Sequence, residues 1–540
     1  MTHEPSILAL FPEAGAIPSR YDIAAPLHLR TYLVDGELLP WQGEVQDVVS
    51  PISLRTGDTL TPRVIGSCPM LDEAAALAAV EAVCKAWNNG TGQWPTMTVA
   101  ERIRHIEDFT LRMVEKREDI IRLLMWEIGK PLLECSVEFD RTVDYIRDTV
   151  DAMKDLDRAS SRFVIEKGIY AQIRRAPLGP VLCMGPFNYP LNETFATLIP
   201  ALIMGNPAIV KTPKMGRLFF APMLEAFREC FPAGVINVLF GDRRVAKPIM
   251  ASGRINVLAF IGTSNAADIL RLAHPQPHRL RCILGMDAKN AAIILDSADM
   301  DTVIGEVLNG SLAFSGQRCT ALKIIFVQRS RVDAFLQRFN EAIPTLPLGM
   351  PWDDGVRITP LPVPGKVEYL DSLVADAISH GAQVVNKGGA THAGPLYHPT
   401  VLYPVTPAMR VYHEEQFGPV VPVVPFDDVE TPLSYIISSQ YGQQLSVFGT
   451  DPDAVAHFID PLVNQVCRVN INSQCQRGPD TFPFTGRKDS AEGTLSVSDA
   501  LRSFSIRTLV AAKGTDANKA LLSGIIRTRK SNFLSTDFLL

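Results

Sequence analysis

Apolar residues recur at helical spacing in the first third of the chain. Residues 72–88, 98–127 and 131–156 repeat apolar side chains three or four positions apart, which predicts amphipathic helices. The next segment, 161–176, alternates apolar and polar residues on both sides of a Lys-Gly pair, which predicts a β-hairpin.

Short apolar runs replace this pattern from Gly179 onward. The runs are GPVLCMG, NPAIVK, VINVLFG and INVLAFIG, and the helical stretches that follow them start near Leu191, Arg217, Arg244 and Ala266. Four consecutive strand–helix units predict a parallel sheet with helices on both faces. A second α/β region spans 290–485 and is followed by a strand in SFSIRTLVAA, and the residues from Gly514 are interpreted as a tail.

Composition narrows the class of protein. With 540 residues, of which 46% are hydrophobic and 20% charged, the chain is predicted to fold into several domains rather than to be disordered or fibrous. A net charge of −6 without a basic tract excludes nucleic acid as the expected partner. The absence of an apolar run of about 18 residues, and of signal-peptide features, predicts no membrane span and no secretion. Nine scattered cysteines without a CxxC pair indicate reduced thiols and a cytoplasmic location.

Polar residues follow two of the predicted strands, where parallel sheets bind ligands. Asn188 and Tyr189 stand between two prolines after the first strand, although a helix-entry loop would look the same. Lys211, Thr212 and Lys214 follow the second strand without an acidic neighbour. In dinucleotide sites an acid at this place binds ribose hydroxyls, whereas a basic residue accommodates a 2′-phosphate. Neither a GxGxxG nor a P-loop pattern is present.

A candidate nucleophile lies further along the chain. Cys319 follows Arg318 beside the apolar run LKIIFV, and a neighbouring cation can lower the pKa of a thiol. A buried, inert cysteine is the alternative interpretation. Glu415, in a turn-like segment, could bind hydroxyls or cap a helix. The histidines show no metal-binding spacing, so no metal is expected.

Taken together, five segments resemble the aldehyde dehydrogenase superfamily over residues 30–513. They are GPFNYP, IVKTPK, FIGTS, FSGQRCTA and EEQFGPV, in the family's order. Within the superfamily the chain is most similar to the non-phosphorylating, NADP-dependent glyceraldehyde-3-phosphate dehydrogenases. The similarity rests on Tyr189, on Arg318 and on the segment INSQCQRGPDTFPFTG, which contains Arg477. In addition, Arg141 falls where that group has another anion-binding arginine.

The resemblance implies a mechanism and a set of roles. Cys319 would attack the aldehyde, the Asn188 amide would hold the oxyanion, hydride would pass to the nicotinamide, and water would release the acid. The residues implied to bind NADP are Lys211, Thr212, Lys214, Gly241, Gly262, Thr263, Glu415 and Phe417. The residues implied to bind the phosphate of a small aldehyde substrate are Arg141, Tyr189, Arg318 and Arg477.

One position departs from the family pattern. The family's base is the glutamate of an E-L-G-G-K segment, whereas Gly285 occupies that position here, in GMDAK. Asp287 is the candidate substitute, with a structural carboxylate as the alternative. CoA-acylating members of the superfamily also lack this glutamate, so a CoA-acylating semialdehyde dehydrogenase is the second hypothesis. A non-catalytic homologue is the third.

The resemblance also implies an α/β fold built from three parts. These are a Rossmann-type cofactor domain (30–158 and 177–284), an α/β catalytic domain (285–488) and a small β oligomerisation arm (159–176 and 489–513). An extension (1–29) and a tail (514–540) flank them. Exposed strand edges in the arm would need partners, which predicts a homodimer or homotetramer.

Overall fold

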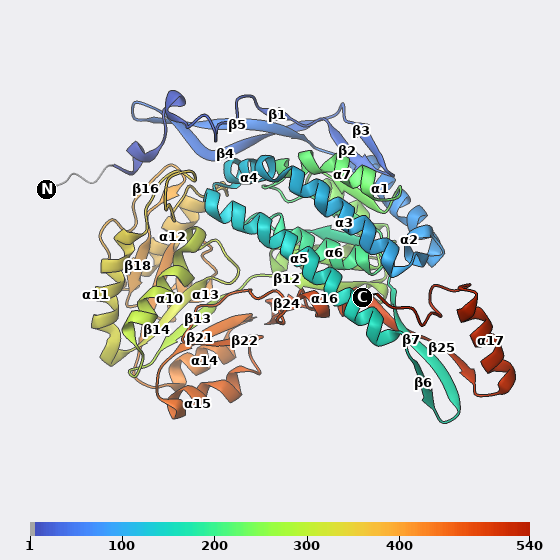
Figure 1. Cartoon of the computed structure of the whole chain (residues 1–540). Helices are drawn as coiled ribbons and strands as arrows, with labels where there is room; N and C mark the ends of the chain where they lie inside the picture. Colours follow the sequence, from blue (N-terminus) through green and yellow to red (C-terminus); the bar gives the residue numbers. More distant parts are fainter. Residues whose placement is uncertain (1–5, 540) are drawn as a thin grey trace.

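The first α/β region folds around an eight-stranded sheet in the computed structural model of this chain, which describes residues 6–539 (Figure 1). The five central strands run parallel, and the strand next to them on either side is antiparallel to them. In spatial order the strands are β24 (Ala491–Glu492), β12 (Arg281–Gly285), β11 (Val257–Ile261), β8 (Val181–Met184), β9 (Ala208–Lys211), β10 (Ile236–Leu239), β2 (Thr31–Val34) and β3 (Glu37–Pro40). All four predicted strands are therefore confirmed.

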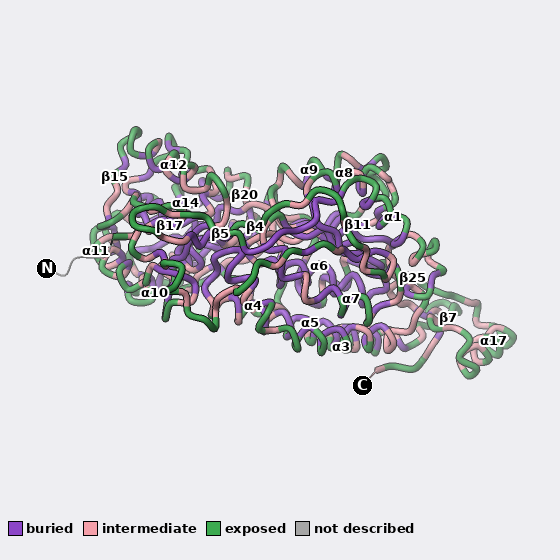
Figure 2. Tube along the Cα trace, turned by 90° about the horizontal axis from the view of Figure 1, so that it is seen from above, coloured by how far each residue is buried: buried purple, intermediate pink, exposed green. Residues whose placement is uncertain are grey.

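Helices cover this sheet on both sides, which explains why its central strands are continuous apolar runs (Figure 2). On one side lie α1 (Glu73–Trp87), α8 (Arg243–Ala251) and α9 (Ser264–Ala273). On the other side lie α3 (Val99–Glu115), α4 (Arg117–Ile128), α5 (Leu132–Ser160), α6 (Asn192–Ile203) and α7 (Leu224–Cys230). Every residue of α6 is buried, because α3 and α5 pack over it from outside.

Residues 98–127 form two helices, where the sequence predicted one. A capping box of Thr98 and Glu101 starts α3, and the chain leaves helical geometry at Lys116 before α4 begins. The two helices pack against different partners, α3 against α6 and α7, and α4 against the long strand β4 (Val45–Thr56). Tertiary packing, which periodicity does not show, explains the break.

The second α/β region contains a seven-stranded sheet in which only the edge strand β15 is antiparallel. In order the strands are β15 (Gln383–Val384), β18 (Thr400–Tyr403), β19 (Val420–Phe426), β14 (Leu322–Gln328), β13 (Asn290–Ile294), β21 (Gln444–Phe448) and β22 (Arg468–Ile471). The main helices of this region are α10 (Met300–Leu312), α11 (Val332–Ala342), α12 (Lys366–Ser379), α14 (Glu430–Ser438) and α15 (Pro452–Leu462). The predicted α/β class is thus seen in both regions.

A three-stranded antiparallel sheet projects from the body of the molecule (Figure 1). The predicted hairpin forms its strands β6 (Phe163–Glu166) and β7 (Ile169–Pro177), which are joined by a left-handed turn at Lys167 and Gly168. The predicted C-terminal strand, β25 (Ser505–Lys513), pairs with β7 along its whole length. However, β24, which we assigned to the same arm, pairs with β12 in the first sheet.

Both ends of the described chain pack onto the fold. In the N-terminal segment Phe11 is buried, and β1 (Leu27–His28) pairs with β5 (Thr59–Pro69). After β25 the chain forms α17 (Asp516–Arg527), which has no buried residue. It then packs back against β7, where the backbone of Ser535 forms hydrogen bonds with the side chains of Gln172 and Arg174.

Membrane-spanning helices, metal-binding clusters and disulfide bonds are absent from the described chain. None of the helices in residues 6–539 is long and apolar enough to cross a membrane. The same residues contain no group of three or more His, Cys, Asp or Glu side chains that could hold a metal ion. All nine cysteines lie within the described chain, and none of them forms a disulfide.

Candidate active site

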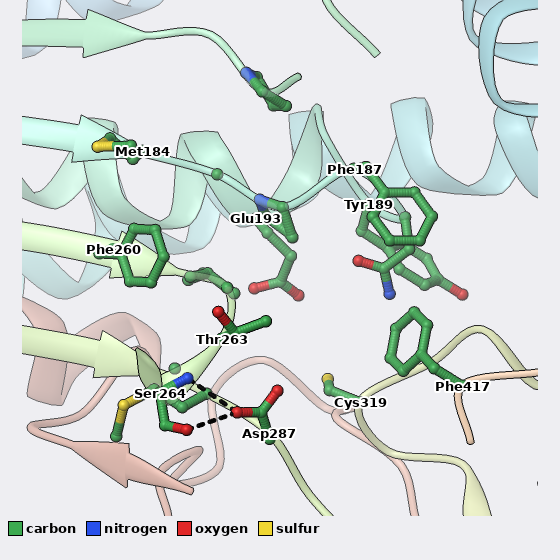
Figure 3. A pocket seen from close by; sticks show the side chains of 18 of the residues that line it. Met184, Phe187, Tyr189, Glu193, Phe260, Thr263, Ser264, Asp287, Cys319 and Phe417 are labelled. Carbon is green, nitrogen blue, oxygen red and sulfur yellow. Dashed lines mark hydrogen bonds between the residues drawn. The ribbon is translucent and has the colours of Figure 1, made fainter. Parts of the chain in front are cut away.

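A cavity of about 870 Å³ lies between the two α/β regions, a size typical of ligand pockets (Figure 3). One wall is formed where β8, β9, β11 and β12 end, and the other by Cys319 and residues 414–417. The predicted site residues that line it are Asn188, Tyr189, Lys211, Thr212, Lys214, Gly262, Thr263, Asp287, Cys319, Glu415 and Phe417. Gly241, Arg141, Arg318 and Arg477 do not line it.

The loop before Cys319 has an unusual backbone. Phe314, Ser315 and Gly316 all have positive φ, at 49°, 53° and 72°. Left-handed geometry is costly for residues with a side chain, so the surrounding structure must hold this loop in place. A Cβ atom on Gly316 would lie 2.6 Å from the carbonyl oxygen of Gly418. The glycine thus allows the nucleophile loop to pack directly on the 414–418 segment.

The Cys319 thiol is half-buried and its backbone is anchored. The carbonyl oxygen of Cys319 accepts hydrogen bonds from Asn290 Nδ2 (2.8 Å) and Lys323 Nζ (2.9 Å). Burial raises the pKa of the thiol, and the Glu193 carboxylate raises it further, whereas Lys323 and Arg477 oppose the shift.

The expectation that Arg318 would lower the pKa of Cys319 is wrong. The guanidinium of Arg318 turns away from the cavity, and its Nη2 donates to the carbonyl oxygens of Asn309 (3.0 Å) and Gly310 (2.9 Å). Adjacency in sequence therefore did not bring the two groups together.

Asn188 is placed beside the nucleophile loop. Its Nδ2 donates to the carbonyl oxygen of Gln317 (2.8 Å), two residues before Cys319. The backbone carbonyl oxygen of Asn188 accepts from Lys130 Nζ (3.1 Å), which anchors the main chain of this loop. The side-chain amide is therefore oriented by Gln317 and lines the same cavity as the thiol.

A fully buried ion pair supports this loop, and the sequence did not reveal it. Lys130 Nζ donates to Glu138 Oε2 (2.6 Å) and lies 3.3 Å from the centroid of the Tyr189 ring. The other oxygen of Glu138 accepts from the backbone N–H groups of Leu191 and Asn192, where α6 begins. Lys130 lies between two predicted helices and Glu138 lies within one, where charged residues normally face solvent. Nothing in the sequence therefore indicated that this pair is buried.

The sheet side of the cavity carries unpaired cations. Lys211, at the end of β9, is buried, and neither it nor Lys214 forms an ion pair among the described residues. Burial lowers the pKa of Lys211 to about 8, and the nearby Arg217 adds to this effect. Thr212 Oγ1 is buried without a hydrogen-bond partner in the described chain. These features suit an anionic, hydroxyl-rich ligand.

Asp287 and Thr263 both hold the start of α9. The Thr263 side chain accepts from the N–H of Ala266. Asp287 Oδ2 accepts from the backbone N–H and the hydroxyl of Ser264, both at 2.8 Å (Figure 3). At least one oxygen of Asp287 therefore has a structural role.

The opposite wall is held by a second lysine network. Glu415 Oε1 forms an ion pair with Lys323 Nζ (2.6 Å) and accepts a hydrogen bond from the N–H of Ala288 (3.2 Å). Phe417 has a φ of 45°, and its ring meets that of Phe187 edge-on at 5.8 Å. Lys323 was not predicted as a site residue, because it lies inside an apolar strand.

The arginines implied to bind a phosphate already have protein partners. Arg141 forms a bidentate pair with Asp480 through bonds of 2.7 and 2.8 Å. Arg477, which is buried, bonds to Glu193 and to Asp480. Only Tyr189 of the predicted phosphate site lines the cavity, and Glu193, which was not predicted, lines it too.

Known proteins are similar to this chain in sequence and in structure. Residues 52–510 match the family model described as "Aldehyde dehydrogenase family". The chain belongs to the aldehyde dehydrogenase family. The predicted fold and enzyme class are thereby confirmed, because this match covers most of the chain.

Individual relatives of this aldehyde dehydrogenase agree over nearly their whole length. The NADP-dependent glyceraldehyde-3-phosphate dehydrogenase of Streptococcus equinus is 31% identical over 469 residues, which cover 84% of this chain and 93% of the relative. The enzyme of the same name from Zea mays is 29% identical over 483 residues, covering 87% and 92%. The crystal structure of the NADP-dependent glyceraldehyde-3-phosphate dehydrogenase from Bacillus halodurans C-125, complexed with NADP, has a TM-score of 0.81 at 30% identity and covers 90% of this chain and 99% of that one.

Gly285 ends β12 and lines the cavity of this aldehyde dehydrogenase. A Cβ atom there would make ordinary contacts, with the nearest atoms at 3.4 Å on Ile261 and 3.7 Å on Leu495. The position could therefore hold a larger residue, and the absence of a side chain is not imposed by close packing.

Proposed function

We propose that this enzyme oxidises glyceraldehyde 3-phosphate to 3-phosphoglycerate with NADP, through a thioester on Cys319 and without inorganic phosphate. The observation that carries the proposal is the cavity shared by the Cys319 thiol and the Asn188 amide, with the amide fixed to the nucleophile loop. The names of the relatives support the choice of cofactor and aldehyde.

The chain's own groups perform the first half of the reaction. The Cys319 sulfur attacks the aldehyde carbon after losing its proton, and the Asn188 amide and the Cys319 N–H stabilise the oxygen that becomes negative. A bound NADP⁺ would supply the acceptor for the hydride of this carbon. Lys211, Thr212 and Lys214 would hold its adenosine end, while Thr263 and Glu415 would hold the rest.

The phosphate of the substrate would bind beside Tyr189. Arg477 does not line the cavity, so it could contact the phosphate only if its guanidinium moved toward the cavity while keeping its bond to Glu193. A phosphate-specific enzyme should therefore lose affinity for glyceraldehyde 3-phosphate, but not for glyceraldehyde, in Arg477→Ala. We expect KM to rise about 10–100-fold for the phosphorylated aldehyde alone, since a hydrogen bond to a charged group contributes about 1.5–3 kcal/mol.

The test is NADP⁺ reduction with matched aldehydes, with and without CoA. Oxidation of glyceraldehyde 3-phosphate without CoA, at a higher kcat/KM than glyceraldehyde, is the expected result. A CoA requirement would favour the second candidate, a CoA-acylating semialdehyde dehydrogenase, which Gly285 at the base position supports. Equal rates for both aldehydes would contradict phosphate recognition.

We also propose a homo-oligomer assembled through the β6–β7–β25 arm, and a cytoplasmic location. The arm supports the first proposal because β6 and β25 are edge strands. Unpaired cysteines support the second.

A further inference from the structure

Hydrolysis of a thioester requires a base that can reach the attacking water, and Gly285 has no side chain to supply one. The carboxylates that line the cavity are Glu193, Asp287, Glu414 and Glu415. They differ in the hydrogen bonds and ion pairs that each carboxylate forms, and in how far its charge raises the pKa of the Cys319 thiol.

Three of these carboxylates serve other elements. Asp287 holds the start of α9 through Ser264. Glu414 forms a bidentate pair with Arg410 and accepts from Tyr369, on the outer side of its segment. Glu415 is bonded to Lys323 and is the residue proposed to hold the cofactor.

Glu193 lies in the first turn of α6, on the same segment as Asn188, and points into the cavity (Figure 3). Its Oε2 bonds to Arg477, whereas its Oε1 has no hydrogen-bond partner among residues 6–539. Arg477 is itself fixed by Asp480 and by the carbonyl oxygen of Leu495. The carboxylate is thus held by Arg477 through one oxygen and open at the other.

The electrostatics of the thiol agree with this position. After burial, the negative charge of Glu193 does most to raise the pKa of Cys319, and Glu415 contributes less. Glu193 therefore acts on the place where a thioester would form.

We propose that Glu193 is the general base that activates the deacylating water, an inference that rests on the proposed Cys319 thioester. One proton of the water passes to the carboxylate as the water oxygen bonds to the thioester carbon. The C–S bond then breaks, Cys319 leaves as the thiolate, and the acid product forms. Glu193 returns its proton to the solvent, and no oxidant is consumed in this half of the reaction.

The test is rapid mixing of Glu193→Gln with NADP⁺ and glyceraldehyde 3-phosphate. Glutamine keeps an oxygen for Arg477 but cannot take a proton. We expect a rapid burst of NADPH equal to the enzyme concentration, followed by turnover slowed about 10²–10⁴-fold, the usual contribution of a general base. Intact-mass spectrometry should show the acyl group on Cys319. Glu118→Gln, at an exposed glutamate, is the matched control and should behave like wild type.

Two further measurements separate a base from a structural residue. Hydroxylamine attacks thioesters without a base, so it should restore turnover in Glu193→Gln. A carboxylate at the position usual in the family should do the same, so Glu193→Gln/Gly285→Glu should hydrolyse faster than Glu193→Gln alone. Glu193→Asp, which keeps the carboxylate, should lose less than Glu193→Gln and serves if glutamine impairs folding.

Several results would overturn the proposal. Unchanged turnover in Glu193→Gln, loss of the burst itself, or a burst that appears only in Asp287→Asn would each assign the base elsewhere. An absence of NADPH from the wild-type enzyme with every aldehyde would instead refute the proposed function, so the two failures are distinguishable.

Discussion

At the residue scale, Asn188 has a second amide hydrogen available beside the nucleophile. One hydrogen of Nδ2 is donated to Gln317, which fixes the plane of the amide. The other has no partner among residues 6–539 and would meet the oxygen of an aldehyde bound at Cys319. A preorganised donor at this place would stabilise the negative charge that develops on the aldehyde oxygen.

Asn188→Ala should therefore slow the NADPH burst about 10²–10³-fold, as expected for the loss of one oxyanion donor. The change should leave NADP⁺ affinity unaltered, which equilibrium fluorescence titration can check. A burst rate equal to that of wild type would show that another group holds the oxyanion.

We expect Lys211, one of the residues proposed to hold the cofactor, to make NADP⁺ binding dependent on pH. Its pKa of about 8 means that the free enzyme carries the cation below this pH and loses it above. A bound phosphate or ribose favours the charged form, so NADP⁺ affinity should be highest below pH 8 and fall as pH rises through it. We expect a decrease of about tenfold over the next pH unit or two, within the range of one charged hydrogen bond.

The control for this prediction is Lys211→Arg, which stays charged across the whole range. Its affinity for NADP⁺, measured by calorimetry, should be nearly independent of pH. A wild-type affinity that does not change between neutral and alkaline pH would contradict the role given to Lys211.

At the element scale, the buried pair of Lys130 and Glu138 joins α5 to the start of α6. Glu138 caps the first turn of α6, while Lys130 holds the loop that carries Asn188 and Tyr189. The pair thus links helix packing to the geometry of the active site.

Glu138→Gln should leave Lys130 buried without its counter-ion and destabilise the fold by about 3–5 kcal/mol. The temperature of the first thermal unfolding transition should fall. The NADPH burst should slow because the Asn188 loop loses an anchor. Lys85→Ala, which removes an exposed pair with Asp35, should change stability by only about 0–1 kcal/mol. Equal effects of the two changes on the melting temperature would contradict this account.

Individual residues show how far the sequence could predict the site. That Cys319 and Asn188 line one cavity could be predicted because several family segments occur in order, and their catalytic roles stay predictions. Glu193, Lys130 and Glu138 could not be predicted, because nothing local distinguishes a buried charged residue from one that faces solvent. Arg318 shows the opposite error, since a neighbour in sequence points elsewhere in space.

Some helices and strands could likewise be predicted from the sequence, and others could not. The strands β8 to β11 could be predicted because strands covered on both faces are short apolar runs. The break between α3 and α4 could not, because it depends on which distant elements each helix contacts. The helix α17 was interpreted only as part of a tail, since it lacks a buried face.

At the scale of the whole molecule, the arm leaves apolar residues uncovered. Ile506 and Val510 lie on one face of β25 and are 50% and 37% exposed. Figure 2 shows the arm and α17 at one end of the molecule, beyond the buried centre. A second copy of the chain would bury this face.

Ile506→Asp/Val510→Asp should therefore dissociate the proposed oligomer. Sedimentation equilibrium should give the mass of one chain for this variant and a multiple of it for wild type. Leu111→Asp, at an exposed apolar residue of α3, should leave the mass unchanged. A wild-type protein that sediments as a single chain would refute the assembly.

The most direct test of the whole account is the reaction of Cys319→Ser with NADP⁺ and glyceraldehyde 3-phosphate. Serine keeps the size of the side chain but is a far weaker nucleophile. We predict that wild type forms NADPH and an acyl adduct on Cys319, and that the variant forms neither while it binds NADP⁺ normally. Substantial NADPH formation by Cys319→Ser would contradict the central claim.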